Sequence, residues 1–345
     1  MTTYYRPLSL VFGRDAREMI ATGKAGALGG MPHIGFTHIE VIQRGADRMI
    51  ETYSDLSDLI DIENITRPRP SFGGVAMDAT QVMGIVNVTP DSFSDGGRLA
   101  DAAAGIAHGL GLASEGAVIL DVGGESTRPG SDTVAVEDEI ARIAGVIKGL
   151  STTYIVSADT RKAAVMAAAL QAGARMINDV SALGFDDTSA ATVAEAQVPV
   201  ILMHAQGEPK TMQLNPRYVD VLLDVYDGLA ASVAKAEAAG IGRSHICVDP
   251  GIGFGKSYKQ NLELMAGLSL FHGLGVPVLV GLSRKGFIGA VTGEKAAAER
   301  VHGSVGGALQ AAQQGAHILR VHDVKATVHS LKMFTASGDP DSVDF

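Results

Sequence analysis

The chain has 345 residues, of which 46% are hydrophobic and 19% are charged, and its formal net charge at pH 7 is −10. This composition allows a large buried core and excludes a largely disordered chain. The acidic balance and the lack of a basic block argue against nucleic acid or an anionic membrane as the main partner, because both need clustered Lys and Arg. A small anionic substrate stays compatible with these numbers, since a pocket can be positive on an acidic protein.

The sequence also limits the expected location and redox chemistry. The first thirty residues mix arginines with acidic residues and hold no continuous apolar stretch, so we expect neither a secretory signal nor a transit peptide. No apolar run reaches the ~20 residues that span a bilayer, and the cytoplasm is the expected location. The single cysteine, Cys247, lies in the apolar run HICVD, where a buried core residue is expected rather than a reactive thiol.

Residues 1–80 form an N-terminal extension that lacks the pattern of the rest of the chain, and the sequence assigns it no role. FTHIEVIQR (36–44) is predicted to be a strand. TRPRPSFGG (66–74) is predicted to be a linker, because its prolines block regular structure.

From residue 81 onward a short apolar run, a polar or Gly-rich turn and a helical stretch recur along the chain. Each run is too short for a typical helix, rich in Val and Ile, and bounded by Gly, Pro or Asp, as in a parallel sheet buried on both faces. Between the runs, apolar residues have helical spacing over 137–150, and the Ala-rich stretch 160–172 predicts a helix that begins near Asp159. The runs are VMGIVNV (82–88), AVILDVG (117–123), YIVSAD (154–159), RMINDV (175–180), VPVILMH (198–204), HICVDP (245–250), VPVLVGLS (276–283) and HILRVHD (317–323).

Eight strand–helix repeats in about 265 residues match the size of a (β/α)8 TIM barrel. We therefore predict an α/β barrel over residues 81–335, followed by a C-terminal tail at 336–345. An open doubly wound sheet is the alternative, because periodicity alone does not show closure, and the strand count favours the barrel.

Polar side chains stand at the end of almost every apolar run. In a parallel barrel these ends meet at one mouth, where the catalytic groups of this fold lie, and buried charge is too costly to be placed so regularly without a use. Some of these groups match the edge of a polar heterocycle such as a pterin or purine, others suit a phosphate or carboxylate, and others suit a mobile loop that binds metal. The first set is Asp121, Asp159, Asn178 and Asp249, the second is Arg128, Arg284, Lys285, Arg320 and His322, and the third is Asn87, Asp91 and Asp95.

Two other motifs carry less weight. GIGFGKS (251–257) is not a Walker loop, because Pro250 stands where the first glycine is required, and Lys256 interrupts the dinucleotide-binding spacing. His204 and His322 lie on different runs without a third His or Cys in pattern, so zinc is not expected. The remaining histidines, among them His108, His272 and His329, are expected at the surface or in helices.

Eight segments at the strand ends are long and chemically unusual: MGIVNVTPDSFSDGG (83–97), ILDVGGESTRPG (119–130), SADTRK (157–162), INDVSAL (177–183), MHAQGEPKTMQ (203–213), DPGIGFGK (249–256), GLSRKGFIG (281–289) and RVHDV (320–324). In this order they resemble the dihydropteroate synthases of the folate pathway. The resemblance implies a transferase that condenses 6-hydroxymethyl-7,8-dihydropterin diphosphate with 4-aminobenzoate to give 7,8-dihydropteroate and pyrophosphate. It also implies Mg²⁺ as cofactor, a homodimer, and sulfonamides as inhibitors.

The resemblance further implies roles for individual residues. Ring binding falls to Asp121, Asp159, Asn178, Asp249 and Lys285. Asn87 would bind Mg²⁺, while Arg320 and His322 would hold the pyrophosphate. Phe93, Thr127, Arg128 and Pro129 would close over the aminobenzoate, and Asp95 would order the first loop and support the charged transition state. The substrate-binding set is completed by Met203, Phe254, Gly281 and Gly286.

One position departs from the family pattern. After Ser283-Arg284-Lys285 the family usually has a serine, whose hydroxyl helps to hold the aminobenzoate carboxylate, whereas this chain has Gly286. We therefore expect a weaker contact with that carboxylate and an altered response to sulfonamides, unless backbone amides or Arg128 compensate. Gly286→Ser should then change the KM for aminobenzoate.

Two alternatives stay open at this point. A pterin-binding methyltransferase would share the ring-binding residues but would not explain the cations at Arg284, Lys285 and Arg320. A non-catalytic pterin-binding protein would have little need of the two closing loops. Pyrophosphate release from the two substrates would distinguish all three.

Overall fold

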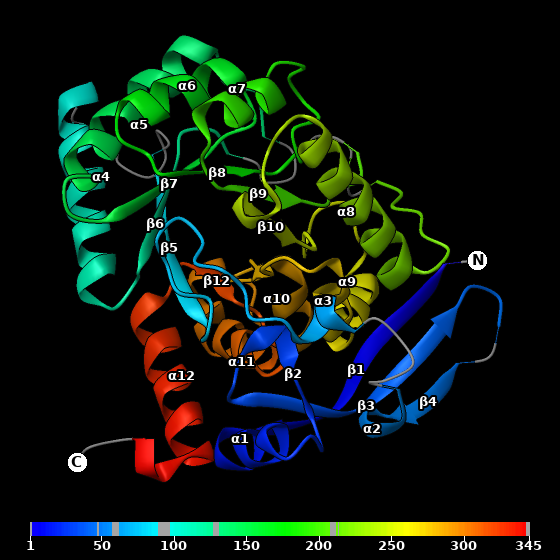
Figure 1. The fold of residues 1–345 in the computed structure, drawn as a ribbon. Coiled ribbons are helices and arrows are strands. Elements are labelled where there is room, and N and C mark those ends of the chain that lie inside the picture. The colour runs from blue at the N-terminus through cyan, green and yellow to red at the C-terminus, as the bar shows by residue number, and fades with distance from the viewer. Residues whose placement is uncertain are drawn as a thin grey trace.

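The computed structural model describes residues 2–46, 48–56, 62–88, 97–126, 131–207, 212 and 214–342, with the backbone alone at 56, 97–101 and 342. Most of these residues form a ring of parallel strands surrounded by helices, and a smaller sheet lies beside the ring (Figure 1). No helix in the described ranges is long and apolar enough to cross a membrane.

The eight apolar runs form eight parallel strands that close into a barrel. Strand order in the sheet follows chain order, and the last strand, β12 (Ile318–Val321), pairs with the first, β5 (Gln81–Asn87). At the remaining junction, Val248 of β10 (Ile246–Asp249) bridges to Val278, just before β11 (Leu279–Val280). The predicted TIM barrel is confirmed, and the open sheet is excluded. The other strands are β6 (Ile119–Gly123), β7 (Ile155–Asp159), β8 (Met176–Asp179) and β9 (Val200–Met203).

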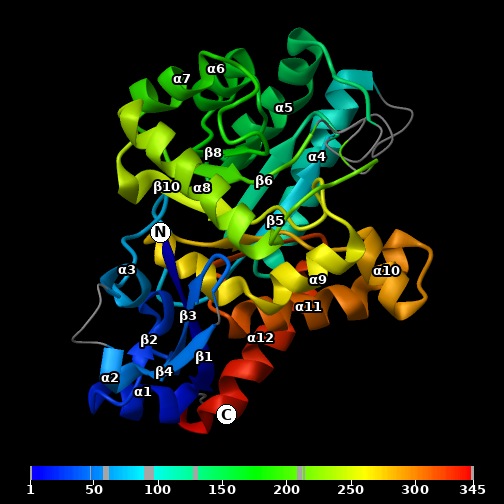
Figure 2. The same ribbon diagram turned by 90° about the vertical axis from the view of Figure 1, so that its right-hand side faces the viewer.

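Helices connect the strands and cover the outside of the barrel (Figure 2). The helix predicted over 137–150 is confirmed as α5 (Val136–Leu150). The helix predicted at 160–172 begins later, because Asp159 points into the barrel and Asp186 accepts the N–H of Ala163 (3.0 Å), where α6 (Ala163–Gln171) starts. The other barrel helices are α4 (Gly97–Ser114), α7 (Ser189–Ala196), α8 (Val221–Ala238), α9 (Tyr258–Ala266), α10 (Gly286–Thr292), α11 (Val301–Gln313) and α12 (Val324–Gly338). Within the described ranges, the short 3-10 helices among them are η3 (Arg243–His245), η4 (Leu268–Leu274), η5 (Ala297–Arg300) and η6 (Pro340–Ser342).

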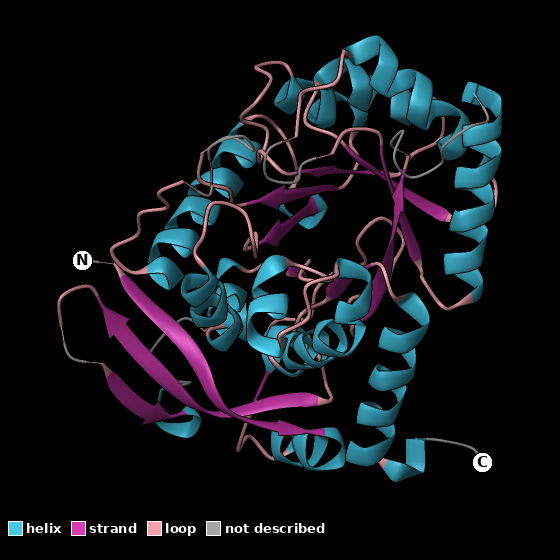
Figure 3. Ribbon diagram, turned by 180° about the vertical axis from the view of Figure 1, so that it is seen from behind, coloured by secondary structure: helices cyan, strands magenta, loops and turns pink. Residues whose placement is uncertain are grey.

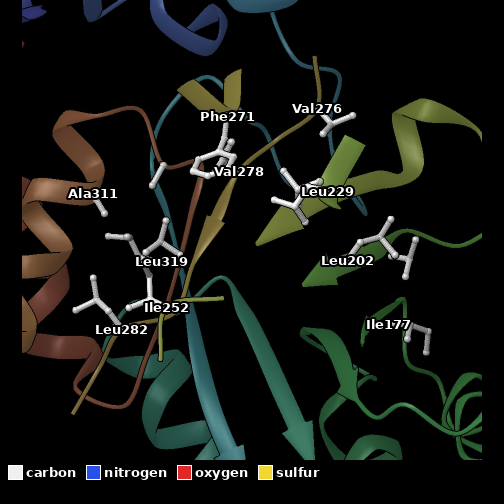
Figure 4. Packing of buried hydrophobic residues seen from close by; sticks show 14 of the residues in the cluster. Ile177, Leu202, Leu229, Ile252, Phe271, Val276, Val278, Leu282, Ala311 and Leu319 are labelled. Carbon is white, nitrogen blue, oxygen red and sulfur yellow. The ribbon is translucent and has the colours of Figure 1, made fainter. Parts of the chain in front are cut away.

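Alternation along the strands separates outward from inward side chains. Outward residues such as Ile177 and Leu202 belong to the cluster that packs against helix residues such as Leu229 (Figure 4). Inward residues form a separate apolar layer near the amino ends of the strands, and Cys247 is buried within it, as predicted. The strand members of this layer are Met83, Ile119, Met176, Ile201, Cys247, Leu279 and Ile318.

A second inward layer lies two residues further along the strands, and it is largely polar. Ile119 is followed by Asp121, and Cys247 by Asp249, because side chains two residues apart share a face of the sheet. The same relation holds for Met176 and Asn178 and for Ile318 and Arg320. Since all eight strands run in one direction, the polar layer lies at their carboxyl ends, on top of the apolar layer.

The segment predicted as a linker closes the amino end of the barrel. Phe72 and Val75 pair through two backbone hydrogen bonds of 2.8 and 3.0 Å, and with Met77 they pack on the apolar layer. Gly73 has a φ of +60°, a left-handed conformation that residues with a Cβ adopt only with strain, so glycine is favoured at this turn. Residues 66–74 therefore do more than link the extension to the barrel.

The rest of the extension forms a small antiparallel sheet with its own core (Figure 3). β3 (Ile34–Gln43) confirms the strand predicted at 36–44, and it pairs along its length with β1 (Thr3–Phe12). Its other edge carries β2 (Gly26–Ala27) and β4 (Met49–Thr52). The helices of this part are α1 (Gly13–Ala21), η1 (Leu28–Gly30), α2 (Tyr53–Leu56) and α3 (Glu63–Thr66). The core residues are Leu28, Met31, Ile34, Phe36, Ile39, Ile62 and Ile65.

The start of the extension lies against the last helix of the barrel. Phe12 meets Phe334 of α12 edge to face, with 5.4 Å between ring centroids. Arg17 of α1 pairs with Asp339, just after α12. The beginning of α1 and the residue before it therefore pack against the end of α12, and both views in Figures 1 and 2 show α1 next to the end of α12.

Two buried histidines lie where the extension meets the barrel. His272 in η4 and His317 before β12 have ring centroids 5.4 Å apart. Nδ1 of His317 accepts the backbone N–H of Val278 (3.1 Å), so Nε2 carries the proton and donates to the carbonyl of Gly29 (3.1 Å). His272 lies in a 3-10 helix, one of the two predicted settings, but it is fully buried there.

We expect stability to fall as the pH drops below about 6.5, because these histidines must stay neutral in the folded protein. Burial lowers the pKa of His272 to about 3 and holds that of His317 well below its usual range. The unfolded chain therefore binds protons that the folded chain does not, which costs about 1.4 kcal/mol per histidine for each pH unit below the unfolded pKa.

Urea unfolding at pH 7, 6 and 5 measures this slope. His272→Gln should reduce the slope of the free energy of unfolding against pH by the contribution of one proton, about 1.4 kcal/mol per pH unit. His329→Gln, at an exposed position on α12, should leave this slope unchanged. Equal slopes in the two variants would contradict the assignment to the buried pair.

Candidate active site

A pocket opens at the carboxyl ends of the strands, where the sequence places its candidate residues. Its lining comes from seven different strands or the loops that follow them, and it includes nine of the predicted residues. Six predicted residues lie outside the described residues: Asp91, Phe93, Asp95, Thr127, Arg128 and Pro129. The pocket is lined by Ile85, Asp159, Asn178, Val180, Met203, Asp249, Phe254, Gly281, Ser283, Lys285, Arg320 and His322.

Arg320 is the centre of the charged layer. Its Nε donates to Oδ2 of Asp121 and its Nη2 to Oδ2 of Asp159, each at 2.6 Å. The side-chain amide of Asn178 donates to the same oxygen of Asp121 at 3.0 Å. One guanidinium thus ties together the ends of β6, β7 and β12, and an amide adds β8.

Two carboxylates share this single guanidinium, and this sharing affects the pKa values of Asp159 and Arg320. Burial is the largest effect on Asp159 and raises its pKa to about 7. The charge of Arg320 opposes this rise in pKa, whereas the charge of the neighbouring Asp121 adds to it. Burial acts to lower the pKa of Arg320, but the two carboxylates outweigh it and raise that pKa above its usual value. Oδ1 of Asp121 is buried and has no hydrogen-bond partner among the described residues. A buried acceptor without a donor is costly, so this oxygen is suited to an N–H group of a bound ring.

Asp249 and Lys285 face each other across another part of the pocket. Oδ1 of Asp249 accepts the backbone N–H of Gly251 at 2.7 Å. Lys285 donates from Nζ to the carbonyl of Ile252, and the same Nζ lies 4.4 Å from the ring centroid of Phe254. Burial lowers the pKa of Lys285 to about 8, while the charge of Asp249 opposes the shift. Near neutral pH the lysine therefore presents a positive charge beside an aromatic ring.

The loop after β10 is held by the buried side chain of Lys256. In the sequence, this residue stands out only because it interrupts the glycine spacing of a dinucleotide-binding motif. Nζ of Lys256 donates to the carbonyls of Gly251 and Phe254 (2.9 Å each) and His204 (3.1 Å). Because these carbonyls belong to the loop after β10 and to the loop after β9, Lys256 holds the two loops together and with them Phe254. Its partners are distant or backbone groups, so no local sequence signal identifies them.

The two last strands carry further cations, and their side chains go in different directions. Nδ1 of His322 lies 3.1 Å from Oγ of Ser283 in the pocket. Arg284 instead forms two hydrogen bonds with Asp323, of 3.0 and 2.5 Å. Its backbone has a φ of +60°, unusual for a residue with a side chain, and the Oγ of Ser304 accepts its N–H at 2.9 Å.

A buried ion cluster lies just behind the pocket, and the sequence reading missed it. Nζ of Lys162 donates to Glu125 (2.6 Å), to Glu139 (2.5 Å) and to the carbonyl of Val134 (2.7 Å). Glu125 also accepts the N–H of Val134 at 2.8 Å. Burial acts to raise the pKa of Glu125, but the hydrogen bonds from Lys162 and Val134 outweigh it and lower that pKa. The cluster fastens both sides of the segment 127–130 to the end of β7.

Other pocket residues were missed although a simple signal was present. Ile85 is two residues after Met83 of the apolar layer, so strand alternation alone turns it inward. Val180 follows the end of β8 and adds a second apolar contact surface. Asp179, in contrast, turns away and accepts the backbone N–H groups of Ser181 and Leu183 at 2.7 and 2.9 Å. Of the two polar residues that end β8, only Asn178 serves the pocket.

Comparison with known proteins places this arrangement in a family. Residues 83–322 match the family described as pterin binding enzyme. The dihydropteroate synthase of Neisseria meningitidis serogroup B is 47% identical over 270 residues, which cover 76% of this chain and 95% of that protein.

Solved structures give the same result. Dihydropteroate synthase of Xanthomonas albilineans with 4-aminobenzoic acid is 48% identical with a TM-score of 0.74, covering 80% of this chain and 99% of that one. The same enzyme in complex with 7,8-dihydropteroate is 46% identical with a TM-score of 0.70, covering 78% of this chain and 97% of that one. The chain therefore belongs to the pterin binding enzymes and, within them, to the dihydropteroate synthases.

Proposed function

We propose that this protein condenses 6-hydroxymethyl-7,8-dihydropterin diphosphate with 4-aminobenzoate, giving 7,8-dihydropteroate and pyrophosphate. The observation that carries the proposal is the charged layer around Arg320, with the unpartnered Oδ1 of Asp121 at its base. Family membership supports the same reaction, since related enzymes were solved with 4-aminobenzoic acid and with 7,8-dihydropteroate.

The deep residues suit recognition of the pterin ring. A pterin edge alternates N–H donors with acceptors, and carboxylates and amides can match both. Asp121 and Asp249 would accept ring N–H groups, and the Asn178 amide and Lys285 would supply donors. Asp159 would act through Arg320, which it holds in place. The apolar faces of Ile85, Val180, Met203 and Phe254 would contact the flat ring, and Gly281 would leave room for it.

The cations at the ends of the last strands suit the diphosphate. Arg320 uses Nε and Nη2 for its carboxylates, and no described residue accepts a hydrogen bond from its Nη1. That group and His322 would hold the leaving pyrophosphate.

Mg²⁺ is the metal that the family implies, and Asn87 fits it. Asn87 continues the inward alternation of Met83 and Ile85, so its half-buried side chain stands at the carboxyl end of β5. Mg²⁺ prefers oxygen ligands and binds through few protein groups plus phosphates and water. When bound there it would neutralise charge on the diphosphate.

The chemistry explains why the pocket has this composition. The C–O bond to the diphosphate breaks, the aromatic amine forms a C–N bond with the methylene carbon, and the amine then loses a proton. The electron-rich ring can stabilise the cation formed as the diphosphate leaves, so anion binding and nearby carboxylates lower the barrier. No strong base is needed, because the aromatic amine is already neutral. We also propose that Phe93, Thr127, Arg128 and Pro129 enclose the aminobenzoate and exclude water, and that Asp95 supports the cation.

Pyrophosphate release from the two substrates, measured with and without Mg²⁺, tests the function. Release that requires both substrates and increases with Mg²⁺ supports it. Methyl transfer without pyrophosphate release would favour a pterin-binding methyltransferase, and pterin binding without turnover would favour a non-catalytic protein.

The pH dependence should report on Lys285. Because its pKa is lowered to about 8 and the charged form attracts the diphosphate substrate, kcat/KM for that substrate should fall above pH 8. In Lys285→Arg the fall should move to higher pH, since arginine stays protonated there, with a lower maximum. A flat wild-type profile between pH 7.5 and 9.5 would contradict this role.

We further propose a cytoplasmic location and a homodimer, for which the family resemblance is the support. Sedimentation of the purified protein measures the oligomeric state, and a monomer at micromolar concentration would contradict the dimer.

A further inference from the structure

Gly286 lies at the exposed rim of the pocket, directly beside the hydroxyl of a tyrosine. A Cβ built on Gly286 would lie 3.1 Å from Oη of Tyr258 and 3.6 Å from its Cε1. Tyr258 is 55% exposed, and no described residue forms a hydrogen bond with its hydroxyl. An available O–H donor therefore occupies the space that a side chain at position 286 would enter.

Tyr258 is held in this place by the start of its helix. Ser257 caps α9 reciprocally with Gln260, through hydrogen bonds of 3.3 and 2.8 Å. Asn261, one turn along the helix, accepts the N–H of Gly253 at 2.6 Å. These contacts tie α9 to the loop that also carries Phe254, so the tyrosine is positioned relative to the pocket.

The second substrate needs a donor at this rim. 4-Aminobenzoate is rigid, with its amine and its carboxylate at opposite ends of the ring. With the amine at the reacting carbon above the polar layer, the carboxylate would lie at the other end of the ring, toward the rim. A carboxylate binds best where a donor meets it.

We propose that Tyr258 is a specificity-determining residue whose phenol O–H donates to the carboxylate of the aminobenzoate. It would take over the task that the family resemblance gives to a serine hydroxyl at position 286, and this inference rests on the function proposed above. The 3.1 Å approach is consistent with the glycine, because a Cβ there would make the tyrosine hydroxyl shift by a few tenths of an ångström. The two hydroxyls compete for one space, and this chain has the tyrosine.

Tyr258→Phe removes the hydroxyl and keeps the ring. We expect the KM for 4-aminobenzoate to rise about five- to tenfold, with kcat and the KM for the pterin substrate unchanged, because binding to the carboxylate is equal in ground and transition states. Tyr154→Phe is the matched control, since Tyr154 precedes β7 at the opposite end of the barrel, and it should behave as the wild type.

Two further measurements separate direct contact from a structural effect. With aniline as the amine, which lacks the carboxylate, wild type and Tyr258→Phe should react equally. Gly286→Ser should lower the KM for aminobenzoate in the Tyr258→Phe background, and it should change that KM much less in the wild type.

An unchanged KM in Tyr258→Phe overturns the inference, as does an equal rise in KM for both substrates or an equal loss with aniline. Failure of the proposed function looks different, since the wild type itself would then release no pyrophosphate. Urea unfolding of each variant checks that the fold is intact, and the half-exposed position of Tyr258 predicts little change.

Discussion

Replacing Arg320 by methionine should reduce pyrophosphate release by about 1,000-fold, because a positioned charged donor is lost where negative charge develops. The same change should destabilise the fold by about 3–5 kcal/mol, since it leaves Asp121 and Asp159 buried without their cation. Steady-state kinetics and urea unfolding of the variant measure both effects.

A second substitution separates these two losses. In Arg320→Met with Asp159→Asn, one buried charge is removed, so part of the stability should return while activity stays low. The single variant should also lose stability as the pH rises from 5 to 8. With the cation gone, the pKa of Asp159 rises above the value near 7 that it has in the wild type, so the folded state holds a proton that the unfolded state releases. Activity above a tenth of the wild-type value in either variant would contradict a direct role for Arg320.

Lys162→Met should destabilise the protein by about 3–5 kcal/mol, because Glu125 and Glu139 would be left buried and unpaired. We expect the KM for aminobenzoate to rise as well, since Lys162 also holds the carbonyl of Val134, on the far side of segment 127–130. Denaturant midpoints and the KM values of the two substrates test this pair of effects.

Lys148→Met is the matched control, because Lys148 is exposed on α5 and should change stability by less than about 0.5 kcal/mol. Adding Glu139→Gln to Lys162→Met should recover part of the loss, since one of the two unpaired carboxylates becomes neutral. A loss no larger than that of Lys148→Met would show that the buried cluster does not stabilise the fold.

Much of the barrel and of its polar layer follows from local sequence, for a definite physical reason. Strand alternation and a common strand direction bring Asp121, Asn178 and Asp249 to one level, whatever the connecting helices do. The position of each such residue relative to its own apolar run therefore suffices to predict where it lies.

What the sequence left undetermined depends on partners far away in the chain. The sequence predicts the same role for Arg284 and Arg320, as cations for a phosphate or carboxylate. In the structure Arg284 pairs with Asp323, whereas Arg320 binds the two pocket carboxylates Asp121 and Asp159. Lys162 gave no signal because its partners lie on other elements. The burial of His272 depends on the extension, whose docking no local pattern encodes.

The packing of α1 against the end of α12 has a consequence for how the protein is made. The Oγ of Ser269 donates to the carbonyl of Pro7, 262 residues earlier, and Arg17 meets a partner 322 residues later. Contacts of such sequence separation form slowly, and chains fold from the N-terminus as they are synthesised. Because β1 and α1 are synthesised well before α12, these contacts form only after α12 has emerged from the ribosome. Until then the apolar faces of the extension and the open barrel need protection from association with other chains.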